Sequence, residues 1–193
     1  MLGSGIRNQR SVVNRVSDIM RLMLLRHAKS EKGAPGMRDR DRPLNPRGQK
    51  DAPRMGDYMA HHALLPDRVI VSPARRTQET WERLAVAFRK APPVHYEERL
   101  YESGPEDILA VLQETKPSAG SLLVIGHNPG LHDTARLLIA AGDVEARERL
   151  SEGFPTSGLA VIDFAGNDWR KLHPRGGRLE RFVTPRSLKA ATR

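Results

Sequence analysis

Three short runs of consecutive apolar residues are the feature that most limits how this chain can fold. They are Leu22–Leu25, Val69–Val71 and Leu122–Ile125, and none of them alternates with polar residues. A strand with one face in water alternates apolar and polar side chains, whereas a strand covered on both faces is apolar throughout. The runs therefore predict central parallel strands in a sheet that helices cover on both faces.

Segments with a helical pattern separate the predicted strands. In residues 75–90, for example, Trp81, Leu84 and Phe88 fall on one stripe of a helix. Strand and helix alternate along the chain, an order that is typical of α/β domains, so we expect a three-layer α/β/α sandwich with a mainly parallel central sheet. The expected strands are residues 21–28, 67–74, 92–101, 121–129, 158–166 and 179–184, and the expected helices lie within residues 46–65, 75–90, 105–116 and 129–142.

The length and the charge distribution predict one domain with basic ends. The chain has 193 residues and a formal net charge of +9, and a length of this order suits a single domain. Residues 1–21 carry four arginines and one aspartate, and residues 184–193 carry three basic residues and no acidic one, so six of the nine net charges lie at the ends. We expect a domain at residues 22–184 between a basic N-terminal extension at 1–21 and a basic C-terminal tail at 185–193.

The composition excludes several classes of protein. The sequence has no cysteine, so it builds neither a disulfide framework nor a cysteine-ligated metal centre. No apolar run approaches the roughly 20 residues of a membrane span, and we expect no membrane partner. Residues 1–21 lack the apolar stretch of a secretory signal, which favours a cytoplasmic location, although an arginine-rich leader poor in acidic residues is also typical of a transit peptide.

Chemically capable residues follow the predicted strands. Arg26 and His27 end the first strand, and Arg76 follows the second. Glu102 follows the third strand and His127 the fourth. In an open parallel sheet, ligands bind at the carboxyl ends of the strands. We therefore expect two arginines, two histidines and one carboxylate to converge at one edge of the sheet.

This set of side chains suits a phosphoryl group. Guanidinium groups pair bidentately with phosphate oxygens and stay charged at physiological pH. A neutral imidazole is a competent nucleophile, and a second, protonated imidazole would stabilise the phosphoryl oxygens in the transition state. A carboxylic acid would protonate the leaving group and later activate water. The residues therefore predict phosphoryl transfer through a phosphohistidine, with no metal and no other cofactor.

Each of these residues has a simpler explanation when it is taken alone. Arg76 and its neighbour Arg75 could belong to a solvated helix face, although cations at a helix N-terminus are unfavourable unless an anion cancels their charge. His127 could be a turn residue, because Asn128 begins a turn signal. Glu102 could cap the helix that follows it. The placement of all of them at successive strand ends is what favours a site.

The same stretches resemble the histidine phosphatase superfamily. LMLLRHAKS is similar to its RHG-type signature, with Ala28 where many members have glycine. RPLNPRG resembles the LTxxG segment, SPARRTQET the SxxxRAxQT segment, LYE the LxE acid site and VIGHNPG the second-histidine loop. The matches follow the family's order over residues 22–165. The short length, the RHAKS form and the lack of a large inserted cap most resemble the SixA-type phosphohistidine phosphatases, which implies a phosphoglycerate mutase-like fold.

The resemblance implies a role for each matched residue. His27 would be the phosphorylated nucleophile. Arg26 and Arg76 would clamp the phosphate, and His127 would complete the pocket. Ser30 stands where relatives place hydroxyl groups that line the phosphate pocket.

The identity of the general acid is open at this point. Glu102 matches the family's acid by spacing, but Asp39 and Asp41 belong to a long loop, residues 30–48, that could approach the same pocket. A phosphohistidine substrate has a nitrogen leaving group, which needs less help from a strong acid. Any of the three carboxylates is therefore compatible with the sequence.

Several functions compete with the favoured one. The resemblance implies a phosphatase that acts on a protein bearing phosphohistidine. The alternative substrate is a small phosphorylated metabolite. A phosphoglycerate mutase is the nearest alternative, but mutases of this superfamily usually carry long insertions, for which this chain has little sequence to spare. A nonhydrolytic phosphate-binding protein would use the same arginines. We expect no nucleic-acid partner, because the excess charge lies outside the domain. His61 and His62 are adjacent and not spaced as zinc ligands.

Overall fold

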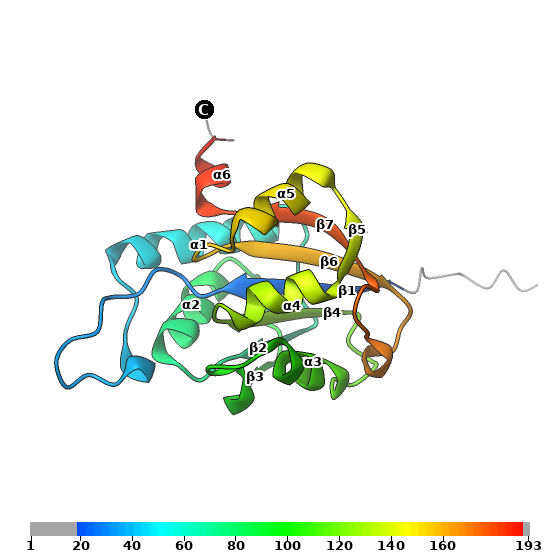
Figure 1. The fold of residues 1–193 in the computed structure, drawn as a ribbon. Coiled ribbons are helices and arrows are strands. Elements are labelled where there is room, and N and C mark those ends of the chain that lie inside the picture. The colour runs from blue at the N-terminus through cyan, green and yellow to red at the C-terminus, as the bar shows by residue number, and fades with distance from the viewer. Residues whose placement is uncertain (1–18, 191–193) are drawn as a thin grey trace, which may run out of the picture.

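The computed structural model describes residues 19–190, which form a single mixed sheet with helices packed against it (Figure 1). The predicted N-terminal extension therefore lies outside the described residues, apart from residues 19–21, which belong to the first strand. The strands are β1 Ile19–Arg26, β2 Arg68–Val71, β3 Val94–Tyr96, β4 Ser121–Gly126, β5 Ile139–Gly142, β6 Leu159–Ala165 and β7 Gly177–Val183. The helices are α1 Pro46–His61, α2 Arg75–Ala85, α3 Pro105–Gln113, α4 Gly130–Leu138, α5 Val144–Glu152 and α6 Pro185–Ala190, with short 3₁₀ turns η1 Asp39–Asp41, η2 Glu98–Leu100 and η3 Trp169–Lys171.

The sheet has the strand order β3-β2-β4-β1-β6-β7-β5, with β1 at its centre. The neighbours from β3 to β1 pair in parallel, as predicted, and β5 is parallel to β7. The expectation of a mainly parallel sheet is confirmed, with β6 as the exception, because it is antiparallel to both β1 and β7. The strand β6 begins beside the carboxyl end of β1, where the Gly158 carbonyl oxygen accepts a hydrogen bond from the Arg26 amide (3.1 Å). From this point β6 pairs with β1 by running in the opposite direction.

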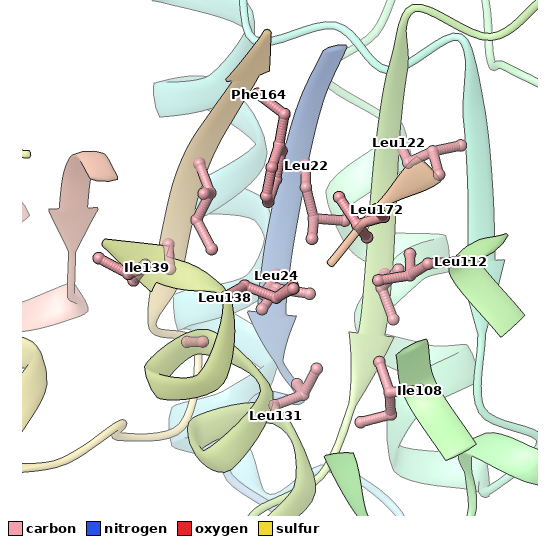
Figure 2. Close-up of a cluster of buried hydrophobic side chains, with 14 of the residues drawn as sticks. Leu22, Leu24, Ile108, Leu112, Leu122, Leu131, Leu138, Ile139, Phe164 and Leu172 are labelled. Carbon is pink, nitrogen blue, oxygen red and sulfur yellow. The ribbon is translucent and has the colours of Figure 1, made fainter. Parts of the chain in front are cut away.

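The strand β1 separates two apolar cores. Leu22 and Leu24 point to one face of the sheet and Met23 and Leu25 to the other, because side chains alternate along a strand, and all four are fully buried. Figure 2 shows the first of these cores, in which α3 and α4 cover the strands. The second core lies under α1 and α2. Apolar cover on both faces explains the continuous apolar runs in the sequence.

The predicted helix over residues 129–142 is wrong in its last turn. The helix α4 ends at Leu138, and Ile139–Gly142 form β5 beside β7. Gly142 has a φ of +136°, and a Cβ atom there would lie 2.2 Å from the Leu179 carbonyl oxygen. This glycine therefore serves a close approach between strands, whereas its position in the sequence suggested a helix stop.

The N-terminus of α1 is fixed by local chemistry. The Asn45 side chain accepts a hydrogen bond from the Gly48 amide (2.9 Å), and Pro46 occupies the first turn. The helix then runs through Pro53. Gly48 is required by close packing, because a Cβ atom would lie 2.1 Å from the Lys29 carbonyl oxygen. The loop between β1 and α1 is thereby held at both ends.

The C-terminal residues that the charge distribution assigns to a tail begin with the helix α6. Its residue Leu188 packs against the core under α1 and α2. Regular secondary structure thus continues past residue 184. Within residues 19–190, no helix combines the length and the apolar composition that a membrane span requires.

Candidate active site

The carboxyl ends of β1, β2 and β4 meet at one edge of the sheet, from which the loop between β1 and α1 projects (Figure 1). Arg26 lies opposite Gly126 in the register, and the His27 amide donates to the Gly126 carbonyl oxygen (3.1 Å). The ring centroids of His27 and His127 are 5.1 Å apart. The structure therefore brings together the two histidines that the sequence placed at successive strand ends.

The geometry of His27 fixes its tautomer. Its Nδ1 lies 2.7 Å from the Ala28 carbonyl oxygen, and because a carbonyl only accepts, Nδ1 must carry the hydrogen. The ring is buried, with 8% of the residue exposed. Burial, followed by the nearby His127 and Arg76, lowers the pKa of His27 to about 3, although the Ala28 hydrogen bond opposes this. His27 is therefore neutral, with its lone pair on Nε2.

The second histidine is held by a serine. The Nε2 atom of His127 lies 2.8 Å from the Oγ atom of Ser72, which is fully buried at the end of β2. The Nδ1 atom of His127 is buried without a partner among the described residues. Burial and then the charge of Arg76 lower the pKa of His127 to about 3. This low pKa favours the neutral ring of His127 in this structure, and its protonation beside a bound phosphoryl group stays a prediction.

The guanidinium group of Arg26 is held by a backbone carbonyl oxygen. Its Nη1 donates to the Phe154 carbonyl oxygen (2.8 Å), which also accepts from the Asn128 side chain (2.9 Å). The Nε of Arg26 is buried and has no partner in the described part of the chain. Desolvation lowers the pKa of Arg26, but a guanidinium group stays charged at neutral pH. One N–H group of this partly buried cation is thus bound by no described residue.

Arg76 lies in the site, whereas its neighbour Arg75 does not. Arg76 is 7% exposed, and Arg75 forms an exposed ion pair with Glu79 (2.7 Å). The Nη1 of Arg76 donates to the Asp39 carbonyl oxygen (2.7 Å) and its Nη2 to the Asp39 carboxylate (2.9 Å). The two terminal nitrogens that would clamp a phosphate are therefore both bound to the loop between β1 and α1.

Asp39 connects several side chains at the mouth of the site. Its carboxylate accepts hydrogen bonds from Arg42 (2.7 Å) and from the Tyr101 hydroxyl (2.9 Å), in addition to Arg76. Burial opposes ionisation, but the bonds from Arg42 and Tyr101 and the charge of Arg76 outweigh it and lower the pKa of Asp39 to about 2. Asp39 is therefore a carboxylate at neutral pH and holds no proton to give to a leaving group. Asp41, the third carboxylate considered, forms an exposed pair with Arg38 (2.7 Å).

Glu102 and Ser30 are placed differently from the other expected residues. Glu102 is exposed at the rim, with a left-handed φ of 54°, and its charge contributes to raising the pKa of the neighbouring Tyr101 hydroxyl after burial and Asp39. Ser30 is buried, accepts a hydrogen bond from Arg42 (3.0 Å) and pairs with Leu44. These contacts make Ser30 part of the loop's anchorage.

Two participants were missed by the sequence reasoning. Tyr101 packs edge-on against the His127 ring, with centroids 5.7 Å apart, and its hydroxyl binds Asp39. It stands beside Glu102 in the LYE motif, so the motif itself could have indicated it. Ser72 opens the SPARRTQET motif and could have been found in the same way.

Comparisons with known proteins assign the chain to a family. The profile of the histidine phosphatase superfamily (branch 1) matches residues 22–111. An uncharacterised protein of Mycobacterium tuberculosis, Rv1276c, is 35% identical over 164 residues, which cover 84% of this chain and 100% of that protein. A candidate phosphohistidine phosphatase SixA from Agrobacterium tumefaciens is 32% identical, with a TM-score of 0.74 over 86% of this chain and 98% of its own. The chain belongs to the histidine phosphatase superfamily.

Within this superfamily the chain is a SixA-like phosphatase, as the sequence predicted. A second candidate SixA structure, from Nakamurella multipartitia, is 28% identical with a TM-score of 0.76 and covers 86% of this chain and 96% of its own. The histidine phosphatase profile ends before His127. The pairing of β1 with β4 is what brings His127 to the part of the site that the profile covers.

Proposed function

We propose that the chain is a metal-independent phosphatase that works through a phosphohistidine at His27. The observation that carries this proposal is the 2.7 Å contact between His27 Nδ1 and the Ala28 carbonyl oxygen, which directs the lone pair of a neutral ring to Nε2. A neutral imidazole nitrogen is the nucleophilic form. The low pKa, about 3, keeps this form dominant throughout the physiological range.

In the first step, His27 Nε2 attacks the phosphorus atom of the substrate. A P–N bond forms to Nε2, and the bond from phosphorus to the leaving oxygen or nitrogen breaks. The leaving atom takes the bonding electron pair and a proton. The Nδ1 hydrogen stays on the ring, and its bond to Ala28 stabilises the positive charge that the phosphorylated imidazole acquires.

The charge of the phosphoryl oxygens is met by Arg26 and Arg76, which supply the positive charge that a metal ion supplies in other phosphatases. His127 Nδ1 is buried without a protein partner in residues 19–190, and it is the ring nitrogen free to contact a phosphoryl oxygen. A bound dianion would raise the pKa of His127 and favour its protonation. The protonated second histidine thus belongs to the substrate complex.

In the second step, water attacks the phosphorus of phosphorylated His27. The P–N bond breaks, inorganic phosphate is released with one oxygen from water, and Nε2 regains its lone pair. Glu102 is proposed to give a proton to the leaving group in the first step and to take one from water in the second. It is the remaining candidate, because the Asp39 carboxylate is bound by Arg76, Arg42 and Tyr101, and Asp41 is paired with Arg38 at the surface.

We propose a phosphohistidine-bearing protein as the substrate. The candidate SixA protein of Agrobacterium tumefaciens, 32% identical over nearly its whole length, supports this choice. The exposed position of Glu102 also supports this substrate. The leaving group of phosphohistidine is a protonated imidazole, which departs from phosphorus without a general acid held firmly in place. A small phosphorylated metabolite is the competing substrate.

The mechanism is tested with para-nitrophenyl phosphate in the presence of a chelator. We expect hydrolysis by the wild type, and loss of at least about a thousandfold in the rate for His27→Ala, as for removal of other catalytic nucleophiles. His95→Ala is the matched control, because His95 is an exposed histidine on β3. Brief incubation with a ³²P-labelled phosphate donor should label the wild type with an acid-labile, base-stable phosphate and leave His27→Ala unlabelled. Activity that needs an added metal ion, or that survives His27→Ala, contradicts the mechanism.

The substrate is tested with peptides of one sequence that carry phosphohistidine or phosphoserine. We expect the phosphohistidine peptide to be hydrolysed with the higher kcat/KM. Equal rates on the two peptides, together with a higher rate on small phosphate esters, would instead favour a metabolite phosphatase.

A further inference from the structure

A cleft of about 900 Å³ opens beside the active site, on the side of Arg26. Its volume lies at the upper end of the roughly 300–1,000 Å³ that small-ligand sites occupy, and a phosphoryl group alone fills little of it. The cleft lies between the end of α5, with the loop that follows it, and the segment from Phe182 to Ser187 that leads into α6. It thus adjoins the phosphoryl site, with Arg26 belonging to both.

The lining of the cleft is predominantly basic. Arg26, Arg149 and Arg186 contribute three positive charges, and Glu152 contributes one negative charge. Arg149 is half exposed, donates to the Phe182 carbonyl oxygen (3.1 Å) and has a loose pair with Glu145 (3.3 Å). Net positive charge on the wall of a cleft favours an anionic ligand.

Arg186 connects the cleft with a feature of the sequence. It belongs to the basic C-terminal segment, whose charge has no use in the proposed mechanism. The helix α6 holds this segment against the fold, with Leu188 packed on the apolar core, and so carries Arg186 to the cleft. Part of the basic end of the chain is therefore a fixed wall of this cleft.

Two residues that line the cleft also have a buried polar atom without a partner. The Nε of Arg26 is a buried donor, and the Oδ1 of Asn128 is a buried acceptor, and neither has a partner within residues 19–190. The wall also includes two buried phenylalanines, Phe154 and Phe182, whose rings pack against each other with centroids 5.2 Å apart.

We propose that this cleft binds an acidic peptide segment that flanks the phosphorylated residue of a protein substrate. Arg149 and Arg186 bind the acidic side chains of the segment, while Arg26 binds the phosphoryl group of the residue that the segment flanks. The inference rests on the proposed phosphatase function and adds a preference for acidic flanking sequences to it. Arg149 and Arg186 are specificity-determining residues, since neither takes part in the chemical steps.

The test compares two phosphohistidine peptides that differ only in their flanks, one with glutamates and the other with glutamines. For the wild type at low salt we expect a kcat/KM about fivefold higher for the glutamate peptide, because exposed ion pairs each contribute modestly. Arg149→Glu and Arg186→Glu should abolish or reverse this ratio mainly through KM, and high salt should reduce it. Arg136→Glu is the control, because Arg136 is an exposed arginine in the last turn of α4 and does not line the cleft.

The rate of para-nitrophenyl phosphate hydrolysis should be the same within about twofold in all of these variants. This substrate has no flanking residues, and the loss of a binding contact affects only a substrate that makes it. The cleft assignment is wrong if the wild type treats both peptides alike, or if the charge reversals leave the ratio unchanged. It is also wrong if the reversals raise KM for a small phosphorylated carboxylic acid but not for the glutamate peptide. If para-nitrophenyl phosphate and both peptides are inert with the wild type, the proposed phosphatase function itself has failed.

Discussion

Arg76 donates both of its terminal nitrogens to Asp39, one to the backbone carbonyl (2.7 Å) and one to the carboxylate (2.9 Å). The two residues are 37 positions apart in the sequence. An internal carboxylate thus occupies the fork of an arginine that, in the proposed mechanism, clamps the phosphate. Substrate phosphate has to share Arg76 with Asp39 or displace it, and the loop between β1 and α1 becomes part of the binding equilibrium.

The first prediction is that Asp39→Asn strengthens the binding of phosphate. The substitution removes a negative charge beside Arg76 and keeps the shape of the side chain, so the positive potential at the site rises. We expect the inhibition constant of inorganic phosphate to fall by about three- to tenfold, which corresponds to a modest change in a solvent-accessible charge interaction. Competitive inhibition of para-nitrophenyl phosphate hydrolysis measures this effect.

Asp41→Asn is the matched control, because Asp41 lies two residues away and forms its ion pair with the exposed Arg38. It should leave the inhibition constant unchanged. Weaker inhibition of Asp39→Asn by phosphate would mean that Asp39 aligns Arg76 for the substrate and does not compete with it.

The second prediction concerns Glu102 as the proton donor. Glu102→Gln should lower kcat for an alkyl phosphate, whose alkoxide leaves poorly without a proton, by about 10²–10⁴-fold. The same substitution should have little effect on para-nitrophenyl phosphate, because nitrophenolate leaves without protonation. A loss of equal size on both substrates would show that Glu102 acts on something other than the leaving group. Glu106→Gln, a change at an exposed glutamate in the first turn of α3, serves as the control.

The third prediction is that the two active-site histidines make the folded state less stable in acid. Burial lowers the pKa of both His27 and His127 from 6.5 to about 3, so below pH 6.5 the unfolded chain binds protons that the folded chain does not. The free energy of unfolding is therefore highest above pH 6.5 and falls as the pH drops towards 3, by about 1.4 kcal/mol per pH unit for each histidine.

Urea unfolding at pH 7 and pH 5 in a buffer without phosphate tests this slope. His127→Gln should flatten the pH dependence, whereas His95→Gln should not, because His95 is exposed. The prediction fails if the wild type and His127→Gln lose the same stability between the two pH values.

The part of the candidate site that directly follows the buried strands could be predicted from the sequence. Continuous apolar runs indicated strands buried on both faces, and the residues directly after them, His27, Arg76 and His127, had to meet once those strands paired in parallel. The two arginines of SPARRTQET were also distinguished correctly, since only Arg76 turns inward. The direction of β6, by contrast, leaves no trace in the period of its side chains.

The contacts that the sequence did not predict depend on distant parts of the chain. Arg26 is held by the carbonyl oxygen of Phe154, and any residue at position 154 would present that atom. Asp39 reaches Arg76 because Arg42 and Tyr101 hold its carboxylate there, and no spacing rule applies to an irregular loop. Local patterns thus located the candidate catalytic groups, and the tertiary structure decided which of them are bound to one another.

The final prediction is that Ser72→Ala weakens the binding of phosphate more than it impairs the chemistry at His27. The Ser72 hydroxyl is the partner of His127 Nε2 at 2.8 Å, and its loss leaves both ring nitrogens of His127 buried without protein partners among residues 19–190. We expect a cost of about 1–3 kcal/mol in the free energy of unfolding. The freed ring should also raise KM and the inhibition constant of phosphate by about tenfold, since a ring no longer fixed in place binds an oxygen less well. The phosphorylated intermediate at His27 should still form.

Thr115→Ala is the control that separates the effect on stability from the effect on phosphate binding. It removes a buried hydroxyl bound to the Val111 carbonyl oxygen at the end of α3, so it should lower stability without changing KM. An unchanged KM in Ser72→Ala would mean that His127 does not contact the phosphate.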